Sequence, residues 1–112
     1  MDINLKKEGK VSIVGVNGRM DANSAPEFEK KMTELIGGGD VFFVVNLTAL
    51  EYISSAGLRG VLASAKRAKA KQGDVYISGL HGTVEEVFKL TGFQSIFKVF
   101  EKEEDAVKQF GA

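Results

Sequence analysis

The 112-residue sequence contains no cysteine, which excludes disulfide bridges, thiolate catalysis and zinc or iron–sulfur centres held by cysteine. Its single histidine, His81, excludes a metal site built from several histidines of one chain. Fifteen basic and fifteen acidic side chains cancel to a formal charge of zero, so no general field attracts nucleic acid or an anionic membrane. Most familiar enzyme chemistries therefore lack the side chains that they need.

Long hydrophobic runs are also missing. The longest unbroken apolar stretch is Val41–Val45, far short of the roughly 18 residues that cross a bilayer. Residues 1–10 alternate charged and apolar side chains and lack the apolar core of a signal peptide. Apolar residues still make up 44% of the sequence, which is typical of a folded protein. We therefore expect one domain over residues 1–112 that is cytoplasmic, inserts into no membrane and binds no nucleic acid directly.

The hydrophobic pattern predicts an N-terminal hairpin followed by alternating helices and strands. Val41–Val45 is apolar throughout, which is typical of a central strand covered on both faces. The order β-β-α-β-α-β-α-β-α predicts an α/β fold with one mixed, mostly parallel sheet, an antiparallel hairpin and about four helices. The predicted strands are 2–6, 10–16, 41–45, 74–78 and 97–100, with Asn17-Gly18 ending the second, and the helices begin at 24, 55, 83 and 103.

Two of these helices have a capping-box sequence at their start. In Ser24-Ala25-Pro26-Glu27 the serine hydroxyl is expected to accept a hydrogen bond from the backbone of Glu27, and proline costs little in the first turn. Thr83-Val84-Glu85-Glu86 repeats the pattern. Both motifs predict a helix N-terminus stabilised by its own side chain.

Ligands and modifications on parallel sheets gather where strands end and helices begin, which directs attention to 17–21 and 46–55. In the second junction, Ser54 or Ser55 is a natural N-cap, and the same helix start favours an anion. Composition alone favours the alternative that these serines only cap the helix. Gly57, one turn into the helix, costs about 0.5–1 kcal/mol relative to alanine, which close approach of another molecule or tight packing on the sheet would offset.

Residues 44–58, Val-Val-Asn-Leu-Thr-Ala-Leu-Glu-Tyr-Ile-Ser-Ser-Ala-Gly-Leu, resemble the signature of STAS domains, the family of bacterial anti-sigma factor antagonists. Gly18-Arg19-Met20-Asp21 resembles the first motif of that family. Residues 73–80, followed by 84–93, resemble its third strand-and-helix block. Together these segments extend the resemblance over nearly the whole chain, from about residue 3 to residue 110. The resemblance implies a STAS-like fold for the single domain.

The resemblance also implies a partner switch. In that family the unphosphorylated antagonist binds an anti-sigma factor that is a serine kinase, phosphorylation of one serine dissociates the complex, and a serine phosphatase reverses it. The implied phosphoacceptor is Ser55, with Ser54 as the alternative because the family often has aspartate at that position. The kinase supplies ATP and magnesium, so we expect no cofactor here. The implied partner-binding residues are Asp21, Asn46 (where the family often has aspartate), Ser54, Ser55, Ala56, Gly57 and Leu58.

Two other functions compete with the switch. Relatives of this fold serve as adaptor subunits of transport or scaffold complexes without phosphorylation, and an exposed hydrophobic patch near residues 56–62 would suit either role. A hydrolase triad of Ser55, His81 and Asp21 is the enzyme alternative. The sequence around Ser55 lacks the G-x-S-x-G nucleophile elbow, and His81 is expected to be exposed or locally hydrogen-bonded. We therefore expect no enzyme activity.

Overall fold

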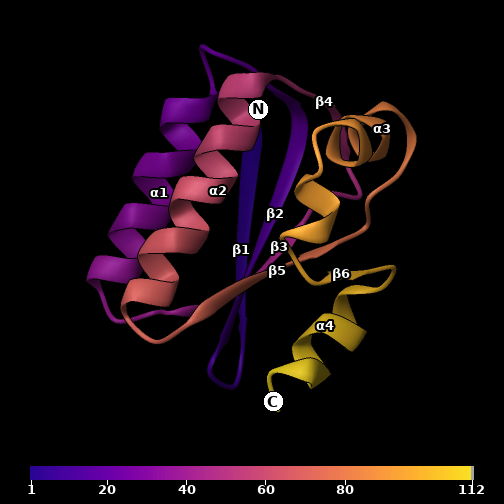
Figure 1. Cartoon of the computed structure of the whole chain (residues 1–112). Helices are drawn as coiled ribbons and strands as arrows, with labels where there is room; N and C mark the ends of the chain where they lie inside the picture. Colours follow the sequence, from indigo (N-terminus) through magenta and orange to yellow (C-terminus); the bar gives the residue numbers. More distant parts are fainter. Residues whose placement is uncertain (112) are drawn as a thin grey trace.

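The computed structural model describes residues 1–111, which form one mixed sheet with helices on both faces (Figure 1). Strands β1 and β2 are antiparallel, and every other pairing in the sheet is parallel. The strands are β1 (Asp2–Glu8), β2 (Val11–Met20), β3 (Phe42–Asn46), β4 (Leu50–Ile53), β5 (Asp74–Ser78) and β6 (Val99–Phe100). The helices are α1 (Ala25–Gly37), α2 (Ser55–Ala70), α3 (Gly82–Leu90), the 3₁₀ helix η1 (Phe93–Ser95) and α4 (Glu103–Gln109).

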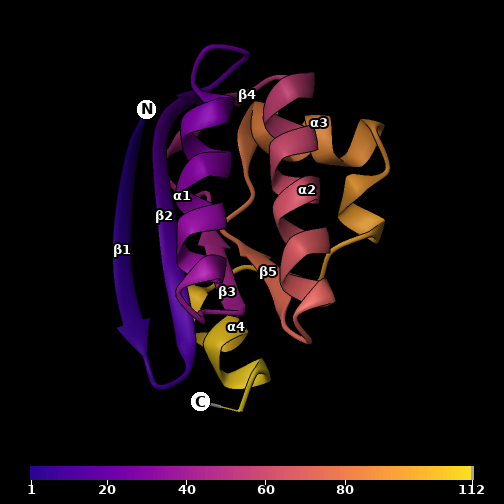
Figure 2. The ribbon, with the colours of Figure 1, turned by 90° about the vertical axis from the view of Figure 1, so that its left-hand side faces the viewer.

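Strand β3 lies in the middle of the strand order β1-β2-β3-β5-β6 and is buried on both faces. Helices α1 and α2 run side by side over one face, and α4 covers the other (Figures 1 and 2). Phe43 and Val45 belong to the core beneath α1 and α2, whereas Val44 packs with Ala106 and Val107 of α4. Because alternate side chains enter two different cores, the strand needs apolar residues at every position. The predicted central strand is confirmed.

The prediction that β2 ends at Asn17-Gly18 is wrong, because the strand continues to Met20. Its pairing changes there: up to Gly15 it pairs with β3, and from Gly18 onward it pairs with β4, with a register shift between Gly18 and Arg19. Gly18 adopts φ +88°, a conformation that glycine tolerates best, and its N–H donates to the Ala49 carbonyl at 3.0 Å. The glycine that suggested a strand end is therefore a bulge inside a longer strand.

Strand β4 was not predicted, and it inserts one additional strand between β3 and α2. It has only four residues, Leu50–Ile53, of which the first and last are buried and the middle two are exposed. Such a short segment, with only its two end positions buried, lacks the alternation that identifies a half-buried strand. Apart from β4 and η1, the predicted order of strands and helices is confirmed.

Both predicted capping boxes are wrong. The Ser24 hydroxyl makes no cap hydrogen bond; it accepts from the Asp21 N–H and donates to the Arg19 carbonyl, each at 2.9 Å. Thr83 lies inside α3, which begins at Gly82, and its hydroxyl donates to the Glu51 carbonyl at 3.2 Å. Ser24 thus bonds to the segment that precedes α1, and Thr83 bonds to a backbone carbonyl of β4, so neither side chain caps the helix start as the local pattern predicted.

Candidate functional site

The start of α2 is fixed by Ser54. This residue is extended (ψ 173°), its N–H donates to the Met20 carbonyl at 2.9 Å, and its hydroxyl accepts from the Gly57 N–H at 3.2 Å. The first bond ties α2 to the end of β2, and the second satisfies one of the unpaired N–H groups of the first turn. Ser54 is therefore the N-cap of α2, and its hydroxyl is engaged within the chain.

Ser55 is the first residue of α2, and it is exposed. None of the side-chain hydrogen bonds among residues 1–111 involves its hydroxyl. The Ser54 cap stabilises the backbone of this helix start, so the exposed Ser55 stands on a regular first turn of α2. Of the two adjacent serines, Ser55 is the one whose oxygen another protein can reach without breaking a hydrogen bond of the chain.

Gly57 is buried against the sheet. A Cβ at this position would lie 2.8 Å from Ile53 Cγ1 and 2.9 Å from the Met20 carbonyl oxygen, distances that side chains do not adopt. Of the two explanations for this glycine, tight packing within the chain is the correct one. Leu58 is also buried, at 2% exposure, so these two predicted partner-binding residues set the position of the helix instead of presenting a surface.

Asp21 lies in the loop between β2 and α1, next to the Met20 carbonyl that binds Ser54. Its Oδ1 accepts hydrogen bonds from the N–H groups of Ser24 at 3.1 Å and Asn23 at 3.0 Å, and from the Ser24 hydroxyl at 3.1 Å. These hydrogen bonds hold the pKa of Asp21 below its ordinary value, and the bond from the Ser24 N–H has the largest effect. An ionised carboxylate therefore stands in the loop that borders the start of α2.

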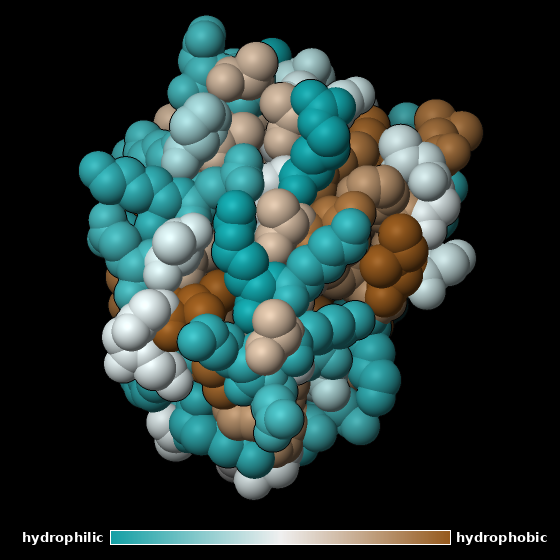
Figure 3. Space-filling model, turned by 60° about the vertical axis from the view of Figure 1, so that its left-hand side comes forward, coloured by the Kyte–Doolittle hydropathy of each residue, from teal (hydrophilic) through white to brown (hydrophobic). Residues whose placement is uncertain are grey.

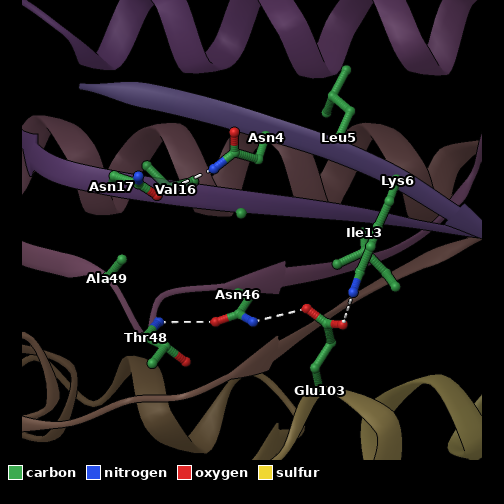
Figure 4. Close-up of a pocket in the computed structure, with 11 residues that line it drawn as sticks. Asn4, Leu5, Lys6, Ile13, Val16, Asn17, Asn46, Thr48, Ala49 and Glu103 are labelled. Carbon is green, nitrogen blue, oxygen red and sulfur yellow. Dashed lines mark hydrogen bonds and ion pairs between the residues drawn. The ribbon is translucent and has the colours of Figure 1, made fainter.

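Asn46 belongs to a different place, on the α4 side of the sheet (Figure 4). Its Nδ2 donates to Glu103 Oε1 at 2.8 Å, its Oδ1 accepts from the Thr48 N–H at 2.9 Å, and Lys6 Nζ lies 2.7 Å from Glu103 Oε2. Burial opposes ionisation of Glu103, but the hydrogen bonds from Lys6 and Asn46 hold its pKa below the ordinary value. Asn46 thus anchors α4 beside a pocket of about 280 Å³, whose lining includes Asn46, Thr48 and Glu103.

Arg19 and Tyr52 form an exposed pair that the sequence did not reveal. They face each other across β2 and β4, and the Arg19 guanidinium lies 4.2 Å from the centroid of the Tyr52 ring. The pair adds a cation and an aromatic ring to the surface formed by the strands that lead to α1 and α2. Because β4 was not predicted, no sequence signal placed these residues opposite each other.

His81 precedes α3, and its Nε2 lies 2.6 Å from the Thr48 carbonyl oxygen. Within residues 1–111, no hydrogen bond joins His81 to Ser55 or Asp21. The three residues of the enzyme alternative are therefore not assembled as a triad. In the same part of the chain, no group of three or more acidic or histidine side chains is placed to hold a metal ion.

The family model of the STAS domain matches residues 2–106 of the chain. The chain belongs to the STAS domain family. BtrV of Bordetella bronchiseptica, a candidate anti-sigma factor antagonist, is 34% identical over 110 residues, which are 98% of this chain and 95% of BtrV. A candidate anti-sigma factor antagonist of Thermotoga maritima has a TM-score of 0.89 at 22% identity, covering 96% of this chain and 92% of its own. The Bacillus protein SpoIIAA, solved in its phosphorylated form, has a TM-score of 0.77 at 19% identity, covering 97% and 99%.

The most exposed apolar side chains of the STAS domain lie on α3 and directly after η1, outside the segment 56–62, where a hydrophobic patch would have suited a docking role. Leu90 is 87% exposed and Ile96 is 49% exposed, whereas Leu58 and Val61 of α2 are buried. Figure 3 shows hydrophobic atoms gathered on the side where α3 lies, next to a largely hydrophilic surface over α1 and α2. Among residues 1–111, no helix of this STAS domain is both long and apolar enough to cross a membrane.

Proposed function

We propose that this STAS domain is an anti-sigma factor antagonist that binds an anti-sigma serine kinase and is released when Ser55 is phosphorylated. The observation that carries the proposal is the free, exposed hydroxyl of Ser55 on a helix start that Ser54 holds rigid. The chain belongs to the STAS family, and a protein similar to it is described as an anti-sigma factor antagonist, which supports the same assignment.

The reaction transfers the γ-phosphoryl group of ATP to Ser55 Oγ. A new O–P bond forms, the bond between the γ-phosphorus and the bridging oxygen of ADP breaks, and the hydroxyl proton passes to a base of the kinase. The kinase holds ATP and magnesium, so this chain contributes only the acceptor and the surface around it. The structure suits that role because the hydroxyl can be phosphorylated without unfolding α2.

Phosphorylation changes the charge of the docking surface. A phosphoserine carries a charge of about −1.5 to −2 near neutral pH, and here it would stand close to the loop that holds the ionised Asp21. Repulsion between like charges and desolvation of the phosphate both oppose binding of a partner that fitted the neutral hydroxyl. A loss of about 2 kcal/mol or more, roughly 30-fold in affinity, is expected when a charge is buried without a partner. A serine phosphatase restores the binding form.

The test is phosphorylation of the purified chain by the anti-sigma kinase of the same organism with Mg-ATP, followed by intact-mass measurement and peptide mapping. We expect the mass of one phosphoryl group on Ser55 and loss of the complex with the kinase. Ser55→Ala should abolish the mass gain and retain the complex.

The matched control is Ser54→Ala, which removes the neighbouring hydroxyl and should still be phosphorylated. Persistence of the mass gain in Ser55→Ala contradicts the proposal. A stable complex that never gains mass supports the adaptor function in its place.

A further inference from the structure

Arg59 lies one helical turn after Ser55 on α2, and both residues are exposed. Among residues 1–111, the ion pairs of the structure do not include Arg59. Arg67, two turns further along the same helix, is different, because its Nη1 lies 3.5 Å from Glu29 Oε1. Of these two arginines of α2, the one nearer to Ser55 in the sequence is thus available for a new partner, and the more distant one is already paired.

Helix geometry directs Arg59 toward Ser55. Residues four apart on a helix have Cβ atoms about 5–6 Å from each other, and long side chains point back toward the N-terminus. This geometry places Ser55 within reach of the Arg59 side chain, one turn away on the same face of α2. The residue three positions after Ser55 is Leu58, which is buried, so no other side chain of α2 shares this reach.

The same helix geometry gives Ser54 no charged neighbour on α2. Ser54 lies four residues before Leu58, which is buried and uncharged, and its hydroxyl is engaged with the Gly57 N–H. Two charged groups of the adjoining segments, Arg19 and Asp21, are also engaged. Arg19 lies over the Tyr52 ring, and the Asp21 carboxylate accepts hydrogen bonds from its own loop.

We propose that Arg59 is the internal counter-ion of the phosphate on Ser55, binding the phosphoryl oxygens through its guanidinium across one turn of α2. This inference rests on the proposed function. Guanidinium groups bind phosphate through two parallel hydrogen bonds, which a lysine at this position would not reproduce. Phosphorylation then changes the docking surface twice, because it adds negative charge at Ser55 and withdraws the positive charge of Arg59 from the partner.

The test uses the full chain with phosphoserine incorporated at position 55 during translation, so that no kinase is required. The pKa of the phosphate is measured by ³¹P NMR titration in three proteins: the otherwise unchanged chain, Arg59→Gln and Arg67→Gln. Loss of an i,i+4 ion pair should raise the phosphate pKa by about 0.3, a roughly twofold change in proton affinity, in Arg59→Gln. Arg67→Gln, the matched control, should titrate like the parent.

Two further readouts separate pairing from an indirect effect. The difference between the parent and Arg59→Gln should shrink in 1 M salt, because exposed charges are screened. The Nε–H resonance of Arg59 should shift when phosphoserine replaces serine at position 55, while that of Arg67 stays in place. Identical titration curves for the parent and Arg59→Gln would contradict the proposal that Arg59 is the counter-ion of the phosphate. Absence of kinase-dependent phosphorylation of Ser55 would instead contradict the proposed function.

Discussion

Helices α1 and α2 both begin after a strand of the sheet, yet the serines that precede them make different hydrogen bonds. Each follows the end of a strand of the same sheet, and each has a serine immediately before its first turn, Ser24 for α1 and Ser54 for α2. Ser54 has an extended backbone, which aims its hydroxyl at the Gly57 N–H. Ser24 has a helical backbone (ψ −23°), and its hydroxyl turns back to the loop that contains Asp21.

The comparison shows how a reactive position is created beside a structural one. At α2 the capping serine is followed by Ser55, whose hydroxyl is exposed on a backbone that the cap holds still. At α1 the following residues are Ala25, which is buried, and Pro26, and neither offers a nucleophile. The same residue type therefore supports two different helix starts, and only the one at α2 presents a hydroxyl to solvent.

The largest effect on stability is expected from Gly57→Ala. Its new methyl group would meet Ile53 and the Met20 carbonyl within 3 Å, so the start of α2 must move away from the sheet. Overpacking of this kind costs about 1–3 kcal/mol of unfolding free energy, measured by urea denaturation. The matched control is Gly37→Ala at the end of α1, where nothing lies within 4 Å; it should leave stability unchanged or raise it by up to about 1 kcal/mol.

Removal of the α2 cap should have the next largest effect. Ser54→Ala loses the hydrogen bond to the Gly57 N–H and should lower the unfolding free energy by about 1 kcal/mol. Ser54→Asp should retain most of the stability, because a carboxylate also caps and suits the positive end of the helix. Ser55→Ala should stay within about 0.5 kcal/mol of the parent. Equal losses for the two alanine variants would show that the two hydroxyls do not differ as described.

The loop before α1 should make stability depend on pH. Because hydrogen bonds hold the pKa of Asp21 below its unfolded value of about 3.9, this group stabilises the fold above that pH. The contribution is lost as the pH falls through the lower, folded pKa. Asp21→Asn should therefore be less stable than the parent at neutral pH and approach it in acid, as followed by urea denaturation from pH 7 to pH 3.

Ser24→Ala, which removes one of the donors to Asp21, should show an intermediate pH dependence. A constant difference between Asp21→Asn and the parent at every pH would show that ionisation of Asp21 plays no part in the loop.

The smallest effect is expected at the start of α3, where His81 holds no helix N–H through its side chain. His81→Ala removes an exposed contact with the Thr48 carbonyl and should change the unfolding free energy by less than about 0.5 kcal/mol. Partner binding and phosphorylation of Ser55 should be unchanged. A loss of either in this variant would give His81 a role that its position does not indicate.

The elements that the sequence predicted well are those with long periodic patterns. The apolar run of β3 and the spacing of Phe28, Met32 and Ile36 on α1 identify their elements, because burial of a continuous face needs regular apolar positions. Strand β4 was missed because its pairing partner is the end of β2, far away in the chain, and four residues carry too little pattern of their own.

The candidate site was predicted in part. The spacing of Ser54, Ser55 and Gly57 at a strand-to-helix junction indicated the region, but not which serine is the cap. Asn46 was assigned to the partner-binding residues by the family resemblance, and its side chain donates a hydrogen bond to Glu103 of α4. Neighbouring residues of a strand differ in their surroundings in this way because a strand alternates its side chains between two faces.

The sequence by itself determined the family, the order of the main helices and strands, and the junction at which a hydroxyl stands, because local patterns and motif spacing are properties of the chain. Only the tertiary structure decided which hydroxyl is engaged and which is free. That choice depends on the Met20 carbonyl, which fixes the backbone of Ser54, and on the packing that buries Gly57. Met20, which takes part in both contacts, belongs to β2 and lies more than thirty residues earlier, so no local pattern contains them.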